Sequence, residues 1–192
     1  MATTRRLVTV RHGETDWNLA RRIQGQMDVP LNETGRLQAL ALTNTLAGFT
    51  PTLIVSSDSQ RAVVTAIPFA TQHKTPIHLS PGLREIYVGT WEGLHIAEAE
   101  RQHPEEYARW HSGEDFPRGG GETRAQTARR VADALLEAVR RDDAGDTVFA
   151  FSHGVALRVG LDLLAAEGFI ALEEPAPHFG NTQWMAVDLL KD

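Results

Sequence analysis

Two histidines in this sequence each follow directly on an apolar run that is typical of a buried strand. Residues 7–10 lead into an Arg-His-Gly triplet centred on His12, and residues 147–151 lead into a Ser-His-Gly triplet centred on His153. Imidazole can act as a nucleophile, an acid or a base near neutral pH. In open α/β sheets, ligands bind where the parallel strands end. The two junctions therefore predict one site that contains both rings.

The composition narrows the chemistry that this site can perform. The chain contains no cysteine, which excludes disulfides, thiolate metal sites and a thiol nucleophile and is compatible with the reducing cytoplasm. We expect a cytoplasmic protein whose chemistry depends on histidines and carboxylates. The apolar run after Arg5 and Arg6 is too short for a signal peptide or a membrane span, so no membrane association is expected.

The net charge of −6 argues against a nucleic-acid-binding surface, for which a broad basic patch is typical. Nucleic acid is therefore not an expected partner. An anionic ligand must instead be held by a local cluster of cations.

Strand-like and helix-like segments alternate between the two histidine junctions. A helix is predicted over residues 36–46, with a buried stripe formed by Leu37, Leu40, Ala41 and Leu46. Residues 52–55 indicate a strand. The helix expected over residues 60–72 contains Pro68, which predicts a kink or an early end.

The second half of the chain continues the same alternation. A polar helix-like segment over residues 97–111 is interrupted by Pro104, and the glycine-rich residues 116–121 form the clearest loop. A long amphipathic helix is predicted over residues 122–141, with a buried stripe formed by Val131, Leu135 and Val139.

An apolar helix near residues 155–164 and a last strand over residues 182–190 complete the pattern. Alternating strands and helices predict an α/β architecture with a largely parallel sheet. The length of 192 residues fits one domain spanning residues 1–192.

Several short motifs occur in an order that resembles the histidine phosphatase superfamily, also called the phosphoglycerate mutase-like family, over most of the chain. The motifs are Arg-His-Gly-Glu-Thr-Asp-Trp-Asn at residues 11–18, Ser-Ser-Asp at residues 56–58 with Arg61, Leu-Arg-Glu at residues 83–85, Trp-Glu-Gly at residues 91–93, Gly-Glu-Thr at residues 121–123 and Ser-His-Gly at residues 152–154. The resemblance implies a three-layer α/β/α sandwich with a mostly parallel central sheet.

The resemblance implies that His12 is the nucleophile and carries a transient phosphoryl group. A neutral imidazole is suited to this, because covalent catalysis divides one difficult displacement into two easier steps. Arg11, Arg61 and a protonated His153 would supply the positive charge that phosphoryl transfer demands, without metal. The alternatives are a structural histidine at either position and an ordinary surface cation at Arg61.

The same resemblance makes Glu85 the general acid. A proton must reach the departing alkoxide, and the carboxylate that supplies it can later accept a proton from the attacking water. Glu85 must then carry a proton at the outset, which the neighbouring Arg84 would oppose if it pointed inward. A surface salt bridge is the alternative interpretation of Glu85.

Further residues are expected around the phosphate and the substrate. By resemblance, Asn18 and the backbone N–H of Gly154 are candidate phosphate donors. Substrate choice is expected from a covering insertion at about residues 93–121, together with the segment that contains Gln24 and Gly25. Within the insertion, Arg118 could place a cation near a second anionic group such as a carboxylate. A solvated surface loop is the alternative.

No metal and no cofactor are expected. The His-x-Glu spacing at His12 lacks the cysteine pair of zinc deaminases, and no His-Glu-x-x-His motif occurs. As to partners, we expect a small phosphorylated metabolite, such as a sugar phosphate or a phosphoglycerate derivative. The resemblance also implies a homodimer, as a family-level expectation.

Three functions are compatible with these motifs. The chain lacks the longer insertion and the extended C-terminal tail that are typical of phosphoglycerate mutases, so a phosphomonoester hydrolase is preferred over a cofactor-dependent phosphoglycerate mutase. A non-catalytic module that binds a phosphorylated ligand is the second alternative. The presence of both the histidine nucleophile and the glutamic acid disfavours it.

Overall fold

A five-stranded sheet forms the centre of the molecule. The computed structural model describes residues 5–190. The sheet contains β1 (Arg6–Arg11), β2 (Leu53–Ser56), β3 (Ile77–Leu79), β4 (Thr147–Ser152) and β5 (Trp184–Asp188), in the spatial order β3-β2-β4-β1-β5. The first four strands run parallel, whereas β5 pairs antiparallel with β1. The largely parallel sheet that the sequence predicts is therefore confirmed.

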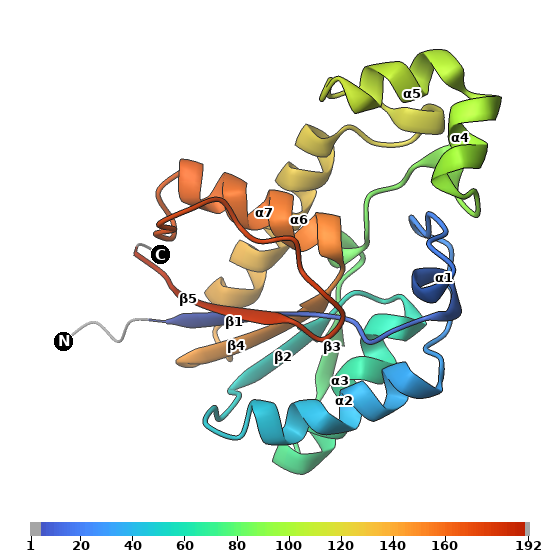
Figure 1. Cartoon of the computed structure of the whole chain (residues 1–192). Helices are drawn as coiled ribbons and strands as arrows, with labels where there is room; N and C mark the ends of the chain where they lie inside the picture. The colour runs from blue at the N-terminus through green and yellow to red at the C-terminus, as the bar shows by residue number, and fades with distance from the viewer. Residues whose placement is uncertain (1–4, 191–192) are drawn as a thin grey trace.

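Helices cover both faces of this sheet and make the three layers of the predicted sandwich. On one face lie α2 (Glu33–Thr45) and α3 (Gln60–His73), and on the other lie α6 (Arg124–Arg140) and α7 (Gly154–Ala166) (Figure 1). The short helices α1 (Asp16–Leu19), α4 (Ile96–Gln102) and α5 (Pro104–His111) lie beyond the carboxyl ends of the parallel strands. The fold class is confirmed.

Local signals in the sequence explain where the covering helices begin. Asn32 caps α2 by accepting a hydrogen bond from the backbone N–H of Gly35 at 2.8 Å. Thr123 and Gln126 form a reciprocal capping box at the start of α6, which satisfies two N–H groups that would otherwise lack partners. The predicted helix of residues 122–141 therefore begins two residues later than expected.

Pro68 does not end α3. The helix continues through it to His73 and ends at Lys74, which adopts a left-handed conformation. The expected early end is wrong, because Phe69 and Ala70 beyond the proline are buried against the sheet. Their burial outweighs the hydrogen bond that a proline cannot donate.

The predicted buried stripe of α2 is also wrong for most of its members. Leu37 and Leu40 are 61% and 56% exposed. The buried stripe consists instead of Gly35, Ala39, Leu42 and Leu46. A Cβ at Gly35 would lie 2.1 Å from the carbonyl oxygen of Glu14, so α2 approaches the loop after His12 as closely as only a glycine permits.

Two apolar clusters hold the layers together. One lies between the sheet and the α6/α7 layer and includes Val131, Leu135 and Val139, as the stripe of the amphipathic helix predicts. The other lies between the sheet and the α2/α3 layer and is centred on Phe69, Phe149 and Phe151. The sheet is therefore buried on both faces, as is usual for parallel strands.

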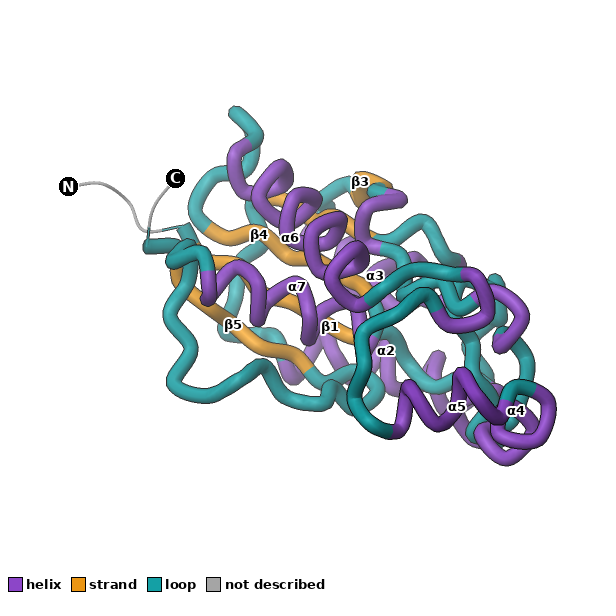
Figure 2. Tube along the Cα trace, turned by 90° about the horizontal axis from the view of Figure 1, so that it is seen from above, coloured by secondary structure: helices purple, strands orange, loops and turns teal. Residues whose placement is uncertain are grey.

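Residues 93–121, here called the cap, extend away from the sandwich on the side where the strands end (Figures 1 and 2). The cap contains α4 and α5, and Pro104 is the first residue of α5, so the interruption predicted there is confirmed. A third apolar cluster packs beneath these helices around Trp91, Ile86, Val88 and Ala99. The cap thus has a small core of its own.

The glycine-rich end of the cap is fixed by a close backbone contact. Gly89 has φ +50°, and a Cβ there would lie 1.9 Å from the carbonyl oxygen of Gly119. Gly119 has φ +57°, and its own Cβ would lie 2.4 Å from the carbonyl oxygen of Val88. Both positions require glycine. The two glycines therefore fix the backbone at the end of the cap against the segment that contains Gly89.

Candidate active site

The two histidine junctions lie side by side because their strands are neighbours in the sheet. β1 and β4 pair in parallel, with Arg11 opposite Ser152, so His12 and His153 occupy adjacent positions just past the strand ends. Their ring centroids are 5.2 Å apart. Arg61 reaches the same point from the first turn of α3, after β2. These three side chains are 3%, 0% and 1% exposed.

The ring of His12 is oriented by its own backbone. Its Nδ1 lies 2.7 Å from the carbonyl oxygen of Gly13. A carbonyl can only accept, so this contact assigns the proton to Nδ1 and leaves the lone pair on Nε2. The backbone N–H of Gly13 in turn donates to Thr65 Oγ1 at 2.9 Å. His12 is therefore held with an unprotonated nitrogen available for attack.

Three buried nitrogens at this point have no hydrogen-bond partner among residues 5–190: Nε of Arg11, Nε of Arg61 and Nδ1 of His153. Buried polar groups are otherwise almost always paired, and an unpaired one costs free energy. Three such atoms, on side chains that follow neighbouring strands, are typical of a site that binds an oxygen-rich anion.

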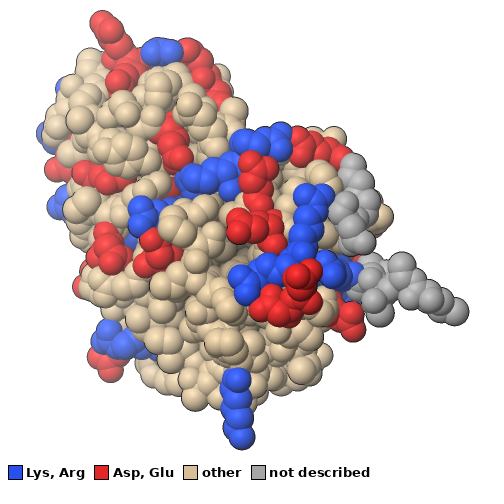
Figure 3. Space-filling model, turned by 180° about the vertical axis from the view of Figure 1, so that it is seen from behind, with Lys and Arg blue, Asp and Glu red and all other residues tan. Residues whose placement is uncertain are grey.

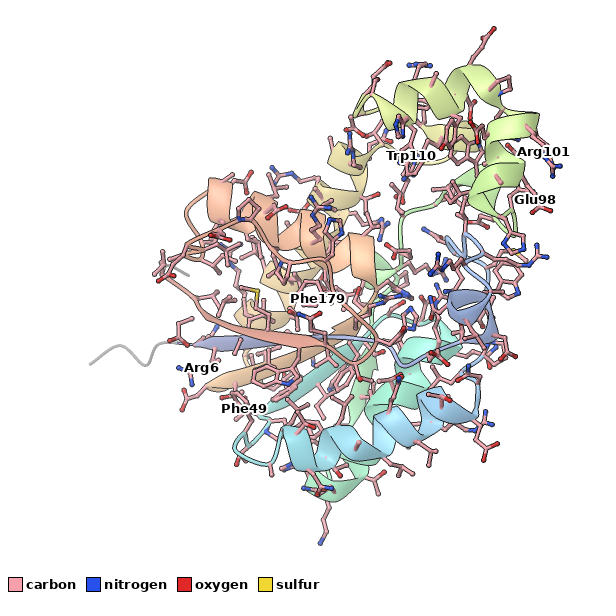
Figure 4. The ribbon with its side chains drawn as sticks, in the orientation of Figure 1. Arg6, Phe49, Glu98, Arg101, Trp110 and Phe179 are labelled. Atoms are coloured by element: carbon pink, nitrogen blue, oxygen red, sulfur yellow. The ribbon has the colours of Figure 1, made fainter. Side chains whose placement is uncertain are left out.

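The remaining donors of the two arginines hold them in place. Arg11 Nη1 donates to the carbonyl of Phe179 at 2.5 Å, and Phe179 lies between α7 and the sheet (Figure 4). Arg61 donates to the carbonyls of Met27 and Gly25 at 2.7 and 2.9 Å. Each guanidinium is thus fixed by backbone carbonyls while its Nε stays free.

Burial and neighbouring cations determine the charge of the two histidines. Burial, followed by the charges of Arg61 and Arg11, holds the pKa of His12 well below its ordinary value. Burial and then Arg61 do the same for the pKa of His153. Both rings are therefore neutral at neutral pH in the free protein. A bound phosphate would favour protonation of His153, whose Nε2 lies 2.9 Å from Ser57 Oγ.

Glu85 joins the site from the segment that follows β3. Its Oε1 accepts from the backbone N–H groups of Ile86 and Ala156 at 2.9 and 2.8 Å, and its Oε2 accepts from Val155 at 3.1 Å. These contacts aim the carboxyl group at the start of α7, next to His153. Glu85 is thus a member of the site rather than of a surface salt bridge.

Arg84 does not line the cavity with Glu85. It pairs through two hydrogen bonds with the carboxylate of Asp58. Arg130 holds the backbone of Glu85. It donates to the Glu85 carbonyl at 3.3 Å and pairs with Glu122 at 2.8 Å.

A cavity of about 200 Å³ opens at this point between the strand ends and the cap. Most of the predicted site residues line it, namely Arg11, His12, Asn18, Gln24, Gly25, Arg61, Glu85 and Arg118. Asn18 Oδ1 accepts from the backbone N–H of Thr15 at 3.2 Å and from Asn181 Nδ2 at 3.1 Å, and Gln24 Oε1 accepts from Thr15 Oγ1 at 3.0 Å. Their amide nitrogens are therefore left to donate to a ligand.

Gly154 and His153, the other two predicted site residues, are not among the residues that line the cavity. A Cβ at Gly154 would lie 3.5 Å from Arg11 Nε, so this glycine packs along the arginine side chain. Within residues 5–190 its backbone N–H has no acceptor. The N–H groups of the two following residues are taken by Glu85.

The sequence did not single out Asn181, which also supports the site. Its Nδ2 donates at 3.1 Å both to the carbonyl of His12 and to Asn18 Oδ1. It therefore links His12 to Asn18, a predicted phosphate donor. Its position just before β5, which runs back beside β1, is the only signal that could have indicated it.

Within residues 5–190, no cluster of three or more His, Asp or Glu side chains is arranged to hold a metal ion. None of the helices in this part of the chain has the length and apolar character needed to cross a lipid bilayer. On the face shown in Figure 3, Lys and Arg side chains are interspersed with Asp and Glu.

The model of the histidine phosphatase superfamily (branch 1) matches residues 7–191. The chain therefore belongs to this superfamily, and the family prediction made from the motifs is confirmed. Among the relatives of this chain are proteins named as phosphatases and as phosphoglycerate mutases.

Two relatives illustrate the similarity in sequence. The glucosyl-3-phosphoglycerate phosphatase of Mycobacterium tuberculosis is 33% identical over 186 residues, which cover 94% of this chain and 83% of that protein. The metal-independent phosphoserine phosphatase of Arabidopsis thaliana is 40% identical over 157 residues, which cover 79% of this chain and 65% of that protein.

Solved structures agree with this assignment. A mycobacterial glucosyl-3-phosphoglycerate phosphatase in complex with VO3 superimposes with a TM-score of 0.83 at 30% identity, covering 98% of this chain and 97% of that one. Phosphoserine phosphatase from Entamoeba histolytica in complex with 3-phosphoglyceric acid gives a TM-score of 0.78 at 29% identity, covering 97% and 95%.

Proposed function

We propose that this chain hydrolyses phosphomonoesters of small metabolites without a metal ion, through a phosphoryl group carried on Nε2 of His12. The buried and unpaired nitrogens of Arg11, Arg61 and His153 carry this proposal, because two of these side chains are cations and all three can serve the oxygens of a phosphoryl group. The names of the relatives support hydrolysis and small phosphorylated substrates.

In the first step, Nε2 of His12 attacks phosphorus and the bond from phosphorus to the ester oxygen breaks. Glu85, protonated at the outset, gives its proton to the departing alkoxide, so the product leaves as a neutral alcohol. Arg11, Arg61 and His153 stabilise the charge that spreads over the three equatorial oxygens. We assign Asn18 and the N–H of Gly154 as further donors.

In the second step, water attacks phosphorus from the side that the alcohol has left. Glu85 takes one proton from this water, and the bond from phosphorus to Nε2 breaks, which releases inorganic phosphate and returns His12 to its starting state. We assign to the hydrogen bond from Nδ1 to the Gly13 carbonyl the role of stabilising the positive charge on the phosphorylated ring.

The direct test is phosphate release from p-nitrophenyl phosphate with a metal chelator present. Wild type and the control variant His78→Asn, on the edge strand β3, are expected to turn over. His12→Asn is expected to lose activity by at least about 10³-fold, as is usual when a covalent nucleophile is removed. Equal activity of His12→Asn and wild type would contradict the proposal, as would activity that depends on added metal.

A second assay distinguishes hydrolysis from the mutase and binding alternatives. The chain is supplied with 3-phosphoglycerate and catalytic 2,3-bisphosphoglycerate. Free phosphate is expected to appear faster than the 2-isomer. Faster isomer formation would instead indicate a mutase, and no turnover of any phosphomonoester would indicate a binding module. The single domain with its covering insertion, the cytoplasmic location and the homodimer stay predictions.

A further inference from the structure

One arginine of the cap faces the cavity without a hydrogen-bond or ion-pair partner among residues 5–190. Arg118 begins the short 3₁₀ turn Arg118–Gly120 and lines the cavity together with Arg11 and Arg61. Among residues 5–190, its guanidinium group makes no hydrogen bond and no ion pair with any side chain or carbonyl. Its five N–H donors are therefore all available to a ligand.

Aromatic rings hold this guanidinium group in position. Its central carbon lies 5.9 Å from the ring centre of Trp91 and 5.7 Å from that of Trp110. Trp110 lies inside the cap, whereas Glu98 and Arg101 lie on the outer side of α4 (Figure 4). Contacts with aromatic faces orient an arginine without using its N–H groups. The cation is therefore preorganised and still free to bind.

The cap backbone around Arg118 is fixed by Glu106. Its Oε2 accepts from Trp91 Nε1 and from the backbone N–H of Gly119, both at 2.9 Å. One carboxylate therefore ties the turn that carries Arg118 to one of the rings that holds it. A side chain on a loop anchored in this way has a defined place relative to the cavity.

Two other arginines near Arg118 have partners in the protein. Arg109 pairs with Glu114 through two hydrogen bonds and lies 4.1 Å over the ring of Phe116. Arg22, which also lines the cavity, donates to the carbonyl of Gly93 at 2.7 Å. Arg118 therefore differs from Arg109 and Arg22, because its guanidinium group contacts aromatic rings and has no hydrogen-bond or ion-pair partner among residues 5–190.

The charges around the cavity do not balance. Four arginines line it, Arg11, Arg22, Arg61 and Arg118, against one carboxylate, Glu85. A phosphoryl group on the strand side is served by Arg11 and Arg61. Burial, followed by the charge of Arg124, lowers the pKa of Arg118, so its charge costs free energy that a second anion would recover.

We propose that Arg118 binds a carboxylate of the substrate, so that the preferred substrates are small phosphomonoesters that carry a carboxylate beside the ester. This inference rests on the proposed function. The planar guanidinium group matches a carboxylate through two parallel hydrogen bonds, and a cavity of about 200 Å³ suits a small molecule that spans from His12 to the cap.

The test compares substrates that differ only in the carboxylate. O-phospho-L-serine is paired with O-phosphoethanolamine, and 3-phosphoglycerate is paired with glycerol 3-phosphate. In wild type, kcat/KM is expected to favour the carboxylate member of each pair by about ten- to a hundredfold, the usual value of hydrogen bonds to a charged group. In Arg118→Met this ratio is expected to fall to near one.

Two further variants separate charge from general damage. Arg118→Lys keeps the charge without the planar fork, so it is expected to retain part of the ratio. Arg109→Met removes a cap arginine that does not line the cavity, and is expected to keep the wild-type ratio. The proposal is overturned if Arg118→Met keeps the wild-type ratio, or if it lowers kcat/KM equally for both members of each pair.

A bisphosphate comparison distinguishes the kind of anion. Fructose 1,6-bisphosphate is paired with fructose 6-phosphate, and an Arg118-dependent preference in this pair alone would overturn the carboxylate assignment. Failure of the proposed function gives a different result: wild type would release no phosphate from any substrate, p-nitrophenyl phosphate included. Turnover of p-nitrophenyl phosphate without a carboxylate preference would reject the Arg118 proposal and leave the phosphatase proposal standing.

Discussion

Replacing Glu85 by Gln removes a proton donor while leaving most of its contacts in place. In the native site, Oε1 accepts from Ile86 and Ala156, and Oε2 accepts from Val155. The amide oxygen of Gln can keep the first two contacts. Its NH2 group would face the N–H of Val155, so about one hydrogen bond is lost, which costs about 1 kcal/mol. The variant is therefore expected to fold.

The effect on catalysis must depend on the leaving group. An alkoxide is a strong base and needs a proton as it departs, and general acid catalysis contributes about 10²- to 10⁴-fold to such steps. We expect kcat/KM of Glu85→Gln to fall by that factor on an alkyl phosphate such as glycerol 3-phosphate. p-Nitrophenolate is stable without a proton, so the fall on p-nitrophenyl phosphate must be much smaller.

The assay is kcat/KM measured for both substrates with wild type and Glu85→Gln. This quantity covers the steps up to departure of the alcohol, so it excludes the later role of Glu85 in activating water. A pre-steady-state burst of p-nitrophenol from the variant would further show that phosphorylation of His12 is faster than hydrolysis of the phosphorylated enzyme. Equal falls in kcat/KM on the two substrates would refute the assignment of Glu85 as general acid.

Three further predictions concern stability. Because burial holds the pKa values of His12 and His153 well below the ordinary value, the unfolded chain binds protons below about pH 6.5 that the folded chain does not. The free energy of unfolding should therefore fall as pH drops below about 6.5, by up to about 1.4 kcal/mol per pH unit for each ring. Urea unfolding at several pH values checks this, and an unchanged slope in His12→Asn would contradict it. A double-mutant cycle of Arg130→Met and Glu122→Gln should give a coupling energy of about 1–3 kcal/mol, because the pair also holds the Glu85 segment. Additive effects of the two substitutions on the free energy of unfolding, measured by thermal unfolding, would argue against that link. Gly89→Ala should lower Tm, since its Cβ would lie 1.9 Å from a carbonyl oxygen, whereas the control Gly48→Ala has nothing within 4 Å and should not; equal Tm values would contradict the close contact.

The arrangement of the candidate site was largely predictable because it depends on sheet topology. Two strand-like runs that each end at a histidine must place the rings together if the strands are parallel neighbours, and the pairing of Arg11 with Ser152 shows that they are. Glu85 lies on a segment without regular structure, so only the motif resemblance could indicate it.

The packing of α2 was not predictable from hydrophobicity. Both the predicted stripe and the observed stripe have helical spacing, and the predicted one contains more leucines. The helix instead buries Ala39 and Gly35, and at Gly35 the loop after His12 approaches too closely for a larger side chain. Such close approaches are set by tertiary contacts, which periodicity does not record.

Asn181 was missed for a related reason. It precedes a strand that the sequence could identify but could not orient. β5 runs antiparallel to β1, with Trp184 opposite Val10. The segment that leads into β5, which contains Asn181, therefore lies at the end of β1. Only the observed pairing places the Asn181 amide beside His12.

Direct detection of the phosphorylated histidine tests the central claim most sharply. Wild type is mixed with substrate, stopped within milliseconds in alkali, in which phosphohistidine survives, and analysed by peptide mass spectrometry. One phosphoryl group is expected on the peptide that contains His12 and none on the corresponding peptide of His12→Asn. Phosphate release with no phosphorylated peptide, or with the group on a different residue, would contradict it.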